Sequence, residues 1–246
     1  MRGYGVSRGM RPIHAGLLGE DVLHLLDEVH LARPYAETLD AVRRYRRLGG
    51  RASALPDRWQ VTQLSATVEG TDGWTFPGRP LDPGSHPVLA RRLSAPKPAV
   101  LTEVAAPADP ARARQKIADV CAQRANALVS SGARTTAVIV NRVDTARRAY
   151  ESLQAVAKEV DVRLITGRMR PIDRDRVLAE IEPRVANGRV RAETDRPLIL
   201  VATQSIEAGA DFDLDAVVSE CASLDALRQR FGRVDRDGML GEAGTT

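Results

Sequence analysis

The 246-residue chain has the composition of a globular protein, with 43% hydrophobic and 28% charged residues, and its length suffices for one or two domains. Its 36 basic and 32 acidic side chains give a formal net charge of +4, which permits a polyanionic partner but does not require one. No apolar run is long enough to span a membrane, and residues 1–20 lack the hydrophobic segment of a signal peptide. We therefore expect no membrane partner and a cytoplasmic location, with Cys121 and Cys221 as buried free thiols.

The first part of the chain has the pattern of one α/β unit. Residues 22–26 form a short apolar run that ends in carboxylates, which is typical of a buried parallel strand. Residues 35–48 predict an amphipathic helix, and residues 59–64 predict a second strand. The expected inward positions of the helix are Ala36, Leu39, Val42 and Tyr45. Two strands and one helix make too small a core to stand alone, so residues 1–68 are expected to be part of a domain.

Residues 69–98 concentrate glycine, proline and serine. This composition predicts an insertion followed by a linker, with one short helix over residues 88–93.

From residue 99 onward, predicted strands and helices alternate. We expect a strand over residues 99–104 and a long amphipathic helix over residues 111–130. Four strand-and-turn or strand-and-helix pairs follow, at residues 136–140 and 145–156, 162–166 and 173–186, 198–202 and a short turn, and 216–219 and 224–231. Such alternation predicts an α/β fold over residues 99–246, with a mostly parallel sheet covered by helices on both faces. Functional sites in such sheets lie at the carboxyl ends of the strands.

An acidic pair, Asp27 and Glu28, directly follows the first predicted strand. One carboxylate there can bind Mg²⁺ through water, and the second can orient or deprotonate an attacking water. The hydroxyls of Ser65 and Thr67, at the end of the next strand, can hydrogen-bond this pair and relay its state. A solvated acidic pair is the ordinary alternative, and His30 alone is as readily explained by burial.

Polar residues also follow the strand at residues 198–202. The hydroxyls of Thr203 and Ser205 and the nearby backbone N–H groups can hold a phosphate of a nucleotide or a nucleic acid. Gly209 would allow a close approach of the ligand. A simple turn from strand to loop explains the same residues equally well.

Two other strands end in polar or basic residues, at Asn141 and at Gly167-Arg168. Successive strand ends of this kind form a rim that could follow a nucleic-acid backbone. Ordinary helix capping by Asn141 and Asp144 is the alternative.

The segment from Gln229 to Arg236 carries Arg230, Arg233 and Arg236 at intervals of three. We predict that these arginines lie on one helical face. Aligned guanidinium groups repel one another unless anions face them, so a phosphate-facing role is expected. A solvated basic helix end is the alternative; Gly232 argues against it, because glycine is unfavourable inside a helix unless something packs closely there.

The ordered set of Asp27-Glu28-Val29-His30, Ser65-Ala66-Thr67, residues 202–211 and residues 229–236 resembles motifs II, III, V and VI of superfamily 2 helicases. More narrowly, it resembles the signature helicase–nuclease of type I CRISPR systems, particularly the I-U (also called I-G) variant. The resemblance covers nearly the whole chain. It implies a RecA-like α/β fold, with a complete second helicase domain over residues 99–246 and a remnant of the first over residues 1–68.

The resemblance also implies roles for individual positions. Asp27 would bind Mg²⁺ and Glu28 would activate water, while Arg233 and Arg236 would face the phosphates of ATP. The implied ATP-binding residues are Gln229, Gly209, Asp211 and His30. The residues implied to couple the nucleotide state to the rest of the domain are Ser65 and Thr67. The residues implied to contact single-stranded DNA are Thr203, Asn141, Gly167 and Arg168.

The chain also departs from the family pattern. It contains no Gly-Lys-Ser/Thr loop, and none of its four histidines is followed by aspartate, so both the main phosphate cradle and the nuclease centre of the family are absent from these residues. Asp235 replaces a glycine that is common in motif VI. We therefore expect little activity from this chain alone, and we expect the CRISPR interference complex and a separate amino-terminal helicase half as partners.

Three other functions fit the same residues. The chain could be a non-catalytic module that binds DNA or a partner, or one half of a split helicase. It could also be a superfamily 2 DNA or RNA helicase unrelated to CRISPR.

Overall fold

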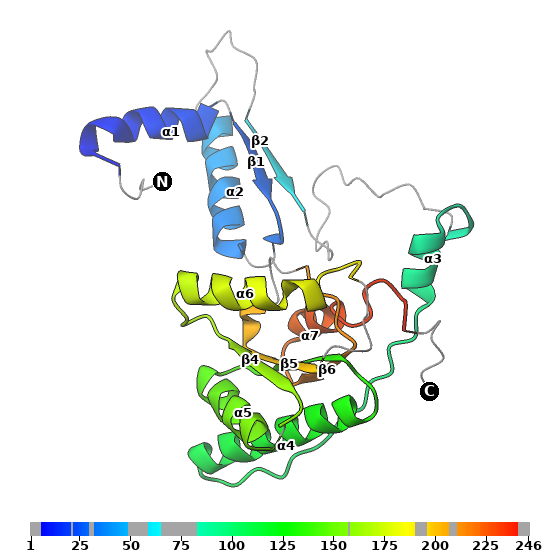
Figure 1. Ribbon diagram of the computed structural model, residues 1–246. Coiled ribbons are helices and arrows are strands. Elements are labelled where there is room, and N and C mark those ends of the chain that lie inside the picture. Colours follow the sequence, from blue (N-terminus) through cyan, green and yellow to red (C-terminus); the bar gives the residue numbers. More distant parts are fainter. Residues whose placement is uncertain are drawn as a thin grey trace. The chain divides into compact units, whose positions relative to one another are not determined.

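The chain divides into two units, residues 1–78 and 79–246, in the computed structural model (Figure 1). The structure describes residues 6–20, 22–29, 32–48, 59–64, 83–156, 158–189, 196–206 and 211–240. The boundary between the units falls within the segment 69–98 that the sequence predicts to be an insertion and linker. In the described part of the chain, no helix is both long and apolar enough to cross a bilayer.

The first unit contains a two-stranded parallel sheet and a small core. Its elements are η1 (Arg8–Met10), α1 (Arg11–Glu20), β1 (Leu23–Leu26), α2 (Arg33–Leu48) and β2 (Gln60–Gln63). Strands β1 and β2 pair in parallel, with Leu23 opposite Gln60. The buried core side chains are Leu26, Ala36, Leu39 and Trp59. Both predicted strands and the predicted helix are confirmed.

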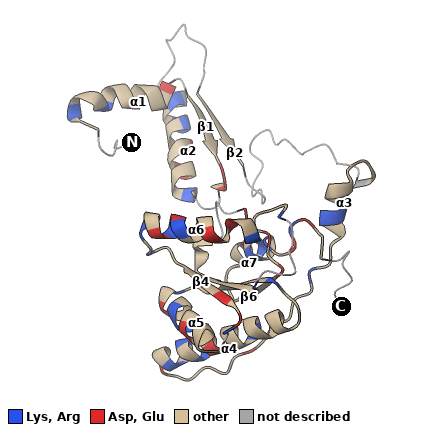
Figure 2. Cartoon of the chain, in the orientation of Figure 1, with Lys and Arg blue, Asp and Glu red and all other residues tan. Residues whose placement is uncertain are grey.

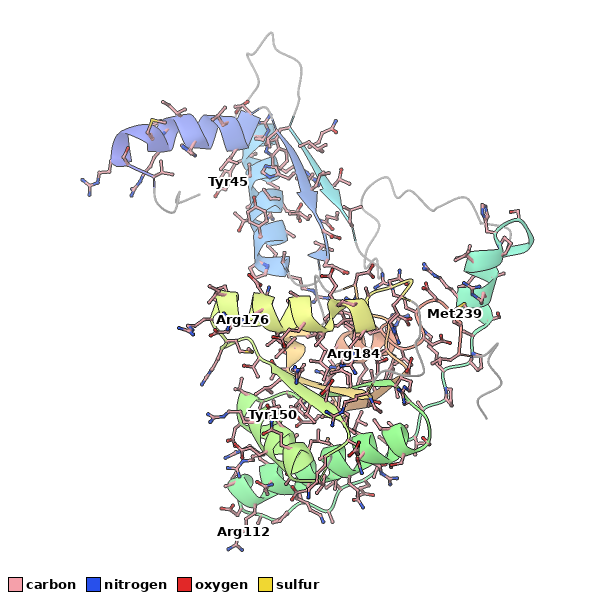
Figure 3. The ribbon with its side chains drawn as sticks, viewed as in Figure 1. Tyr45, Arg112, Tyr150, Arg176, Arg184 and Met239 are labelled. Carbon is pink, nitrogen blue, oxygen red and sulfur yellow. The ribbon has the colours of Figure 1, made fainter. Side chains whose placement is uncertain are left out.

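Tyr45 is not part of this core, contrary to the sequence prediction. Its side chain is 72% exposed and stands on the outside of α2 (Figure 3). Residues three apart on an α-helix are offset by about 60°. Over the nine residues from Ala36 this offset accumulates to about half a turn, so Tyr45 lies opposite the buried stripe.

The second unit is built on a four-stranded parallel sheet in the order β4-β5-β3-β6. The strands are β3 (Thr135–Ile139), β4 (Asp161–Ile165), β5 (Leu198–Ala202) and β6 (Ala216–Ser219). The helices are α3 (Pro87–Ser94), α4 (Pro110–Ser130), α5 (Val143–Val156), α6 (Pro171–Val185) and α7 (Leu224–Phe231), with short 3-10 turns η3 (Pro83–Ser85) and η4 (Gln204–Ile206). The short helix predicted over residues 88–93 is confirmed as part of α3.

Helices cover both faces of this sheet. On one face, α4 and α5 pack against alternate strand residues such as Val138 and Val201. On the other face, α6 packs against the intervening residues, such as Ala137 and Leu200, and α7 lies on the same side as α6 (Figure 1). Because successive strand residues point to opposite faces, each continuous apolar strand contributes side chains to both hydrophobic cores. The predicted α/β class, with a parallel sheet between two helical layers, is confirmed.

The strand predicted over residues 99–104 is wrong. This segment has no regular secondary structure, and the side chains of Val100 and Leu101 are 88% and 93% exposed. A strand needs a partner strand for its backbone groups, whereas the described sheet ends at β4 and β6. The prolines at positions 96 and 98 also remove two backbone donors from the approach to this segment.

Candidate functional site

The acidic pair of the first unit lies where the sequence places it, directly after β1. The ladder between the two strands continues to this point, because the Val29 N–H donates to the Leu64 carbonyl oxygen at 3.3 Å. Asp27 is exposed, and its Oδ1 accepts the Glu28 N–H at 2.9 Å. Glu28 has a φ of +48°, which is uncommon for a residue with a Cβ and recurs at functional sites. His30, Ser65 and Thr67 lie outside the described residues.

These carboxylates fit a magnesium ion that is held mainly by other ligands. Among the described residues, no three metal-ligating side chains come together. Mg²⁺ usually keeps several waters and needs only one or two protein carboxylates together with substrate phosphates. The exposed carboxylate of Asp27 is sufficient for that arrangement, and Glu28 stands beside it.

In the second unit, the loop after β5 lies on the end of β4. The Thr203 N–H donates to the Ile165 carbonyl oxygen at 3.3 Å, and the Ser205 hydroxyl donates to the same oxygen at 3.4 Å. Gly167 and Arg168 follow the end of β4 and are exposed. The carboxyl end of the sheet therefore brings Thr203 close to Gly167 and Arg168, while Gly209 lies outside the described residues.

Asn141 belongs to the same end of the sheet, and its polar groups are engaged within the protein. Its N–H donates to Glu220 Oε2 at 2.8 Å and its Nδ2 to the Cys221 carbonyl oxygen at 2.7 Å. Its Oδ1 accepts from Arg230 at 3.0 Å. The side chain thus ties β3 to the end of β6 and to α7. A direct contact between Asn141 and DNA stays a prediction.

The prediction that Arg230, Arg233 and Arg236 lie on one helical face is wrong. Helix α7 ends at Phe231, and the N–H of Gly232 donates to the Arg228 carbonyl oxygen to close the last turn. Arg230 is 0% exposed, whereas Arg233 and Arg236 lie beyond the helix. Gly232 still has helical dihedrals (φ −62°, ψ −13°), and the chain leaves the helix after it, which separates the three arginines.

The loop that carries Arg233 and Arg236 runs beside Leu214. The Leu214 N–H donates to the Arg233 carbonyl oxygen and the Asp235 N–H to the Leu214 carbonyl oxygen, both at 2.8 Å. Arg236 Nη1 lies 2.7 Å from Asp211 Oδ1. The structure thus brings together two predicted residues, Arg236 and Asp211, while Gln229 is half-buried on the preceding helix.

The backbone explains the residue at position 235. Asp235 has a φ of +42°, in the left-handed region where glycine is the default residue. Aspartate is one of the few other residues that visit this region. Its Oδ1 also accepts the Leu240 N–H at 3.0 Å, so the glycine expected here is replaced by a residue that the backbone allows.

A buried ion network closes the amino end of the sheet, and the sequence reading missed it. Arg189 donates to Asp213 Oδ2 at 3.0 Å and to Asp215 Oδ1 at 2.9 Å, and the three side chains are 4%, 3% and 6% exposed. Arg189 also donates to the Thr135 hydroxyl at 2.8 Å. The alternation of Phe212-Asp213-Leu214-Asp215 before a strand is the available sequence signal, because buried carboxylates require a cation or several donors.

The network also holds the arginine-bearing loop, because the Arg236 N–H donates to Asp213 Oδ1 at 2.7 Å. Arg236 and Asp211 therefore lie toward the amino end of the sheet, away from Thr203 and Arg168 at the carboxyl end. A four-residue parallel strand such as β6 separates the two ends by about 13 Å.

Helix α3 is attached at the amino end through Asp237. Arg91 Nε donates to the Asp237 carbonyl oxygen at 2.7 Å, and Arg92 Nη2 to Asp237 Oδ1 at 2.5 Å. The Gly188 N–H donates to Asp237 Oδ2 at 3.0 Å. Burial raises the pKa of Asp237, but the hydrogen bond and charge of Arg92 and the Gly188 N–H together outweigh it and lower the pKa below its ordinary value.

The two cysteines differ from each other. Cys121 is a buried residue of α4 that faces the core, and burial, followed by the charge of Glu220, raises its pKa to about 11. Cys221 is exposed, so the prediction that both thiols are buried is wrong for it. The residue lies between the end of β6 and α7, in a connection too short to be covered.

Charged side chains are spread over both units (Figure 2). Many are paired locally, as where Asp144 accepts from Arg114 at 2.9 Å and from Arg148 at 3.1 Å. The Arg148 and Arg114 hydrogen bonds lower the pKa of Asp144. Asp144 thus joins α4 to α5.

Comparison with known proteins identifies similarity in the second unit. Residues 132–239 match the family model for the carboxyl-terminal part of the CRISPR-associated nuclease/helicase Cas3. The CRISPR-associated helicase Cas3 of Thermoproteus tenax is 39% identical over 109 residues, which cover 44% of this chain and 17% of that protein. The CRISPR-associated endonuclease/helicase Cas3 of Escherichia coli K12 is 34% identical over 116 residues, covering 46% and 12%.

Among solved structures, the crystal structure of T. fusca Cas3-ATP is similar with a TM-score of 0.47 and 28% identity, covering 59% of this chain and 17% of that one. The matched region thus spans less than a fifth of the length of each of these relatives.

Proposed function

We propose that the chain supplies part of an ATP-dependent motor that moves along single-stranded DNA, because residues 132–239 match the carboxyl-terminal Cas3 family model and resemble Cas3 helicases. The motor would serve type I CRISPR interference, and so antiviral defence, in the cytoplasm. We assign it to the I-U (I-G) variant. The observation that carries this proposal is the separation of two groups in one domain: exposed Gly167 and Arg168 at the carboxyl end of the sheet, and Arg233 and Arg236 on the loop beside Leu214.

The carboxyl end suits a nucleic-acid backbone. Arg168 is exposed and follows a glycine whose Cβ position is open, so a phosphate can approach both the side chain and the backbone N–H groups. Thr203 and Asn141 support this surface from the neighbouring strands β5 and β3. Single-stranded DNA would bind here mainly through its charge, without sequence readout.

The arginine-bearing loop suits the phosphates of ATP. Arg236 is paired with Asp211, whose side chain is 66% exposed, and pairs of this kind contribute only about 0–1 kcal/mol. A nucleotide phosphate can therefore replace the Asp211 carboxylate at little cost. Arg233 and Gln229 would contact the same nucleotide, and Gly209 and Asp211 would border it.

The first unit would supply the hydrolytic carboxylates. Asp27 would hold Mg²⁺ and Glu28 would orient the attacking water, with His30, Ser65 and Thr67 relaying nucleotide state. ATP would provide the phosphoryl group whose transfer drives movement. The expected partners are single-stranded DNA, the CRISPR interference complex and a polypeptide or segment that carries the phosphate-binding loop.

We propose that a polypeptide of these 246 residues does not hydrolyse ATP by itself, because its sequence contains no Gly-Lys-Ser/Thr loop to position the β- and γ-phosphates. Phosphate release from ATP should stay at the background level with and without single-stranded DNA. DNA-stimulated release that disappears in Glu28→Gln would contradict this proposal.

The DNA site can be tested by fluorescence anisotropy with a labelled oligodeoxythymidine. Arg168→Ala should weaken binding several-fold and reduce the slope of log affinity against log salt by about 0.7, the value for one lost phosphate contact on a single strand. Arg112→Ala is the matched control, because Arg112 is exposed at the start of α4 and points away from the body of its unit (Figure 3). Equal slopes for both variants would place the DNA elsewhere.

A further inference from the structure

Arg230 is the largest fully buried side chain among the described residues, and it is a charged one. A guanidinium group is costly to bury unless acceptors surround it. The cost of burying this guanidinium indicates that Arg230 has a specific structural role.

The side chain of Arg230 reaches the carboxyl end of the sheet. Its Nη1 donates to the Ser219 hydroxyl at 2.9 Å and to the Glu220 carbonyl oxygen at 3.0 Å, both at the end of β6. Its Nη2 donates to Asn141 Oδ1 at 3.0 Å, just beyond β3. The planar, forked guanidinium suits these acceptors, whereas a lysine ammonium is a compact group without a fixed fork.

The backbone of Arg230 begins the arginine-bearing loop. Its carbonyl oxygen accepts the N–H of Gly232 and, at 3.1 Å, the N–H of Arg233. Two residues later the loop joins Leu214 through the Asp235 N–H. One residue thus contacts the proposed DNA end with its side chain and supports the proposed nucleotide loop with its main chain.

We infer that Arg230 is a positioning residue that links the DNA-binding end of the sheet to the loop carrying Arg233 and Arg236. It contacts neither ligand. Movement of Asn141 or of the end of β6 is passed through the guanidinium group to the last turn of α7 and then to the loop. This inference rests on the proposed function for its meaning, but the link itself is a property of the free chain.

Amide hydrogen exchange of the 246-residue chain tests the link. The reporters are the N–H groups of Leu214 and Asp235, which join the loop to its neighbouring segment. Arg230→Lys should speed their exchange by about tenfold, because a hydrogen bond to a charged group is among the stronger ones. Amides of β5 should change by less than about twofold, because that strand opens with the core.

Two further variants complete the test. Arg228→Lys is the matched control on the same helix, since Arg228 is exposed, and it should leave the reporters unchanged. Ser219→Ala removes a single acceptor and should shift the same two amides in the same direction by a smaller factor, which keeps the test available if Arg230→Lys does not fold. Unchanged reporters in both Arg230→Lys and Ser219→Ala would overturn the inference. So would equal acceleration throughout residues 79–246, which would make Arg230 only a general core residue.

Adding single-stranded oligodeoxythymidine separates this inference from the proposed function. In the parent chain, DNA should slow exchange at the two reporters, and Arg230→Lys should abolish that response while DNA still binds. A response retained in Arg230→Lys would overturn the link. If DNA does not bind the parent chain, the proposed function fails, and the exchange measured without DNA still decides the inference.

Discussion

At the amino end of the four-stranded sheet, Arg189 lies against two carboxylates, whereas at the carboxyl end Arg230 donates to a hydroxyl, a carbonyl and an amide oxygen. The amino end is closed by short ion pairs and by α3. At the carboxyl end, the buried arginine lies against β6 and β3, and the exposed residues Gly167 and Arg168 follow β4. The difference indicates that the buried network at the amino end stabilises the fold and holds the loop of Arg233 and Arg236 in place, whereas the carboxyl end leaves polar groups accessible for a ligand.

The largest loss of stability is expected for Arg189→Met. The change removes the buried guanidinium that pairs with Asp213 and Asp215, and removing one partner of a buried ion pair costs about 3–5 kcal/mol. Urea unfolding followed by circular dichroism should show a loss of this size. Adding Asp213→Asn and Asp215→Asn to the same chain should recover part of it.

The control for this experiment is Arg112→Met, which changes an exposed arginine and should alter stability by less than about 0.5 kcal/mol. A loss below about 1 kcal/mol for Arg189→Met would mean that the network is not a stabilising closure.

The attachment of α3 predicts a smaller effect at two glycines. Gly188 and Gly238 have φ values of +75° and +68°, but an added Cβ at Gly238 would lie 2.8 Å from the Arg91 carbonyl oxygen, while at Gly188 nothing lies within 4 Å. Gly188→Ala should therefore cost about 1 kcal/mol from backbone strain, and Gly238→Ala about 2–3 kcal/mol because steric overlap is added. Equal losses in urea unfolding would show that α3 does not press on Gly238.

Low pH should weaken the attachment of α3 to Asp237. The folded-state pKa of Asp237 is lowered, so its contribution to stability is complete above the unfolded pKa of about 3.9 and is lost as the pH falls through the lower folded value. A carboxyl titration by NMR should show Asp237 and the α3 amides changing together below that pH. Asp237→Asn should remove this transition, and α3 amides that change at a different pH would contradict the attachment.

The smallest expected change in stability is at the carboxyl end. Arg168→Ala should alter the free energy of unfolding by less than about 0.5 kcal/mol, because the side chain is exposed. Urea unfolding beside the anisotropy measurement checks this. A large loss of stability would remove the contrast between the two ends.

Apart from the strand over residues 99–104, the sequence predicted the elements of the second unit well, because continuous apolar runs and amphipathic periods decide strands and helices locally. It placed Thr203, Gly167 and Arg168 at one end of the sheet, since parallel strands end together. It did not predict that Gly232 ends α7, and so it aligned three arginines that the fold separates. Burial of Arg230 and Arg189 depends on acceptors from distant strands, and no local pattern encodes such contacts.

The proposed roles of His30, Ser65, Thr67 and Gly209 stay predictions, since these residues lie outside the described ones. The Cas3-like match over residues 132–239 favours the CRISPR reading over an unrelated superfamily 2 helicase.

The contrast between the two cysteines has a practical consequence for labelling chemistry. Maleimides and iodoacetamides react with the thiolate, and a pKa of about 11 keeps Cys121 protonated at neutral pH inside the core. Cys221 is exposed, and its carbonyl oxygen accepts from Asn141. Without any engineered cysteine, a fluorophore or spin label should attach at Cys221 alone and report directly on the edge where DNA is proposed to bind.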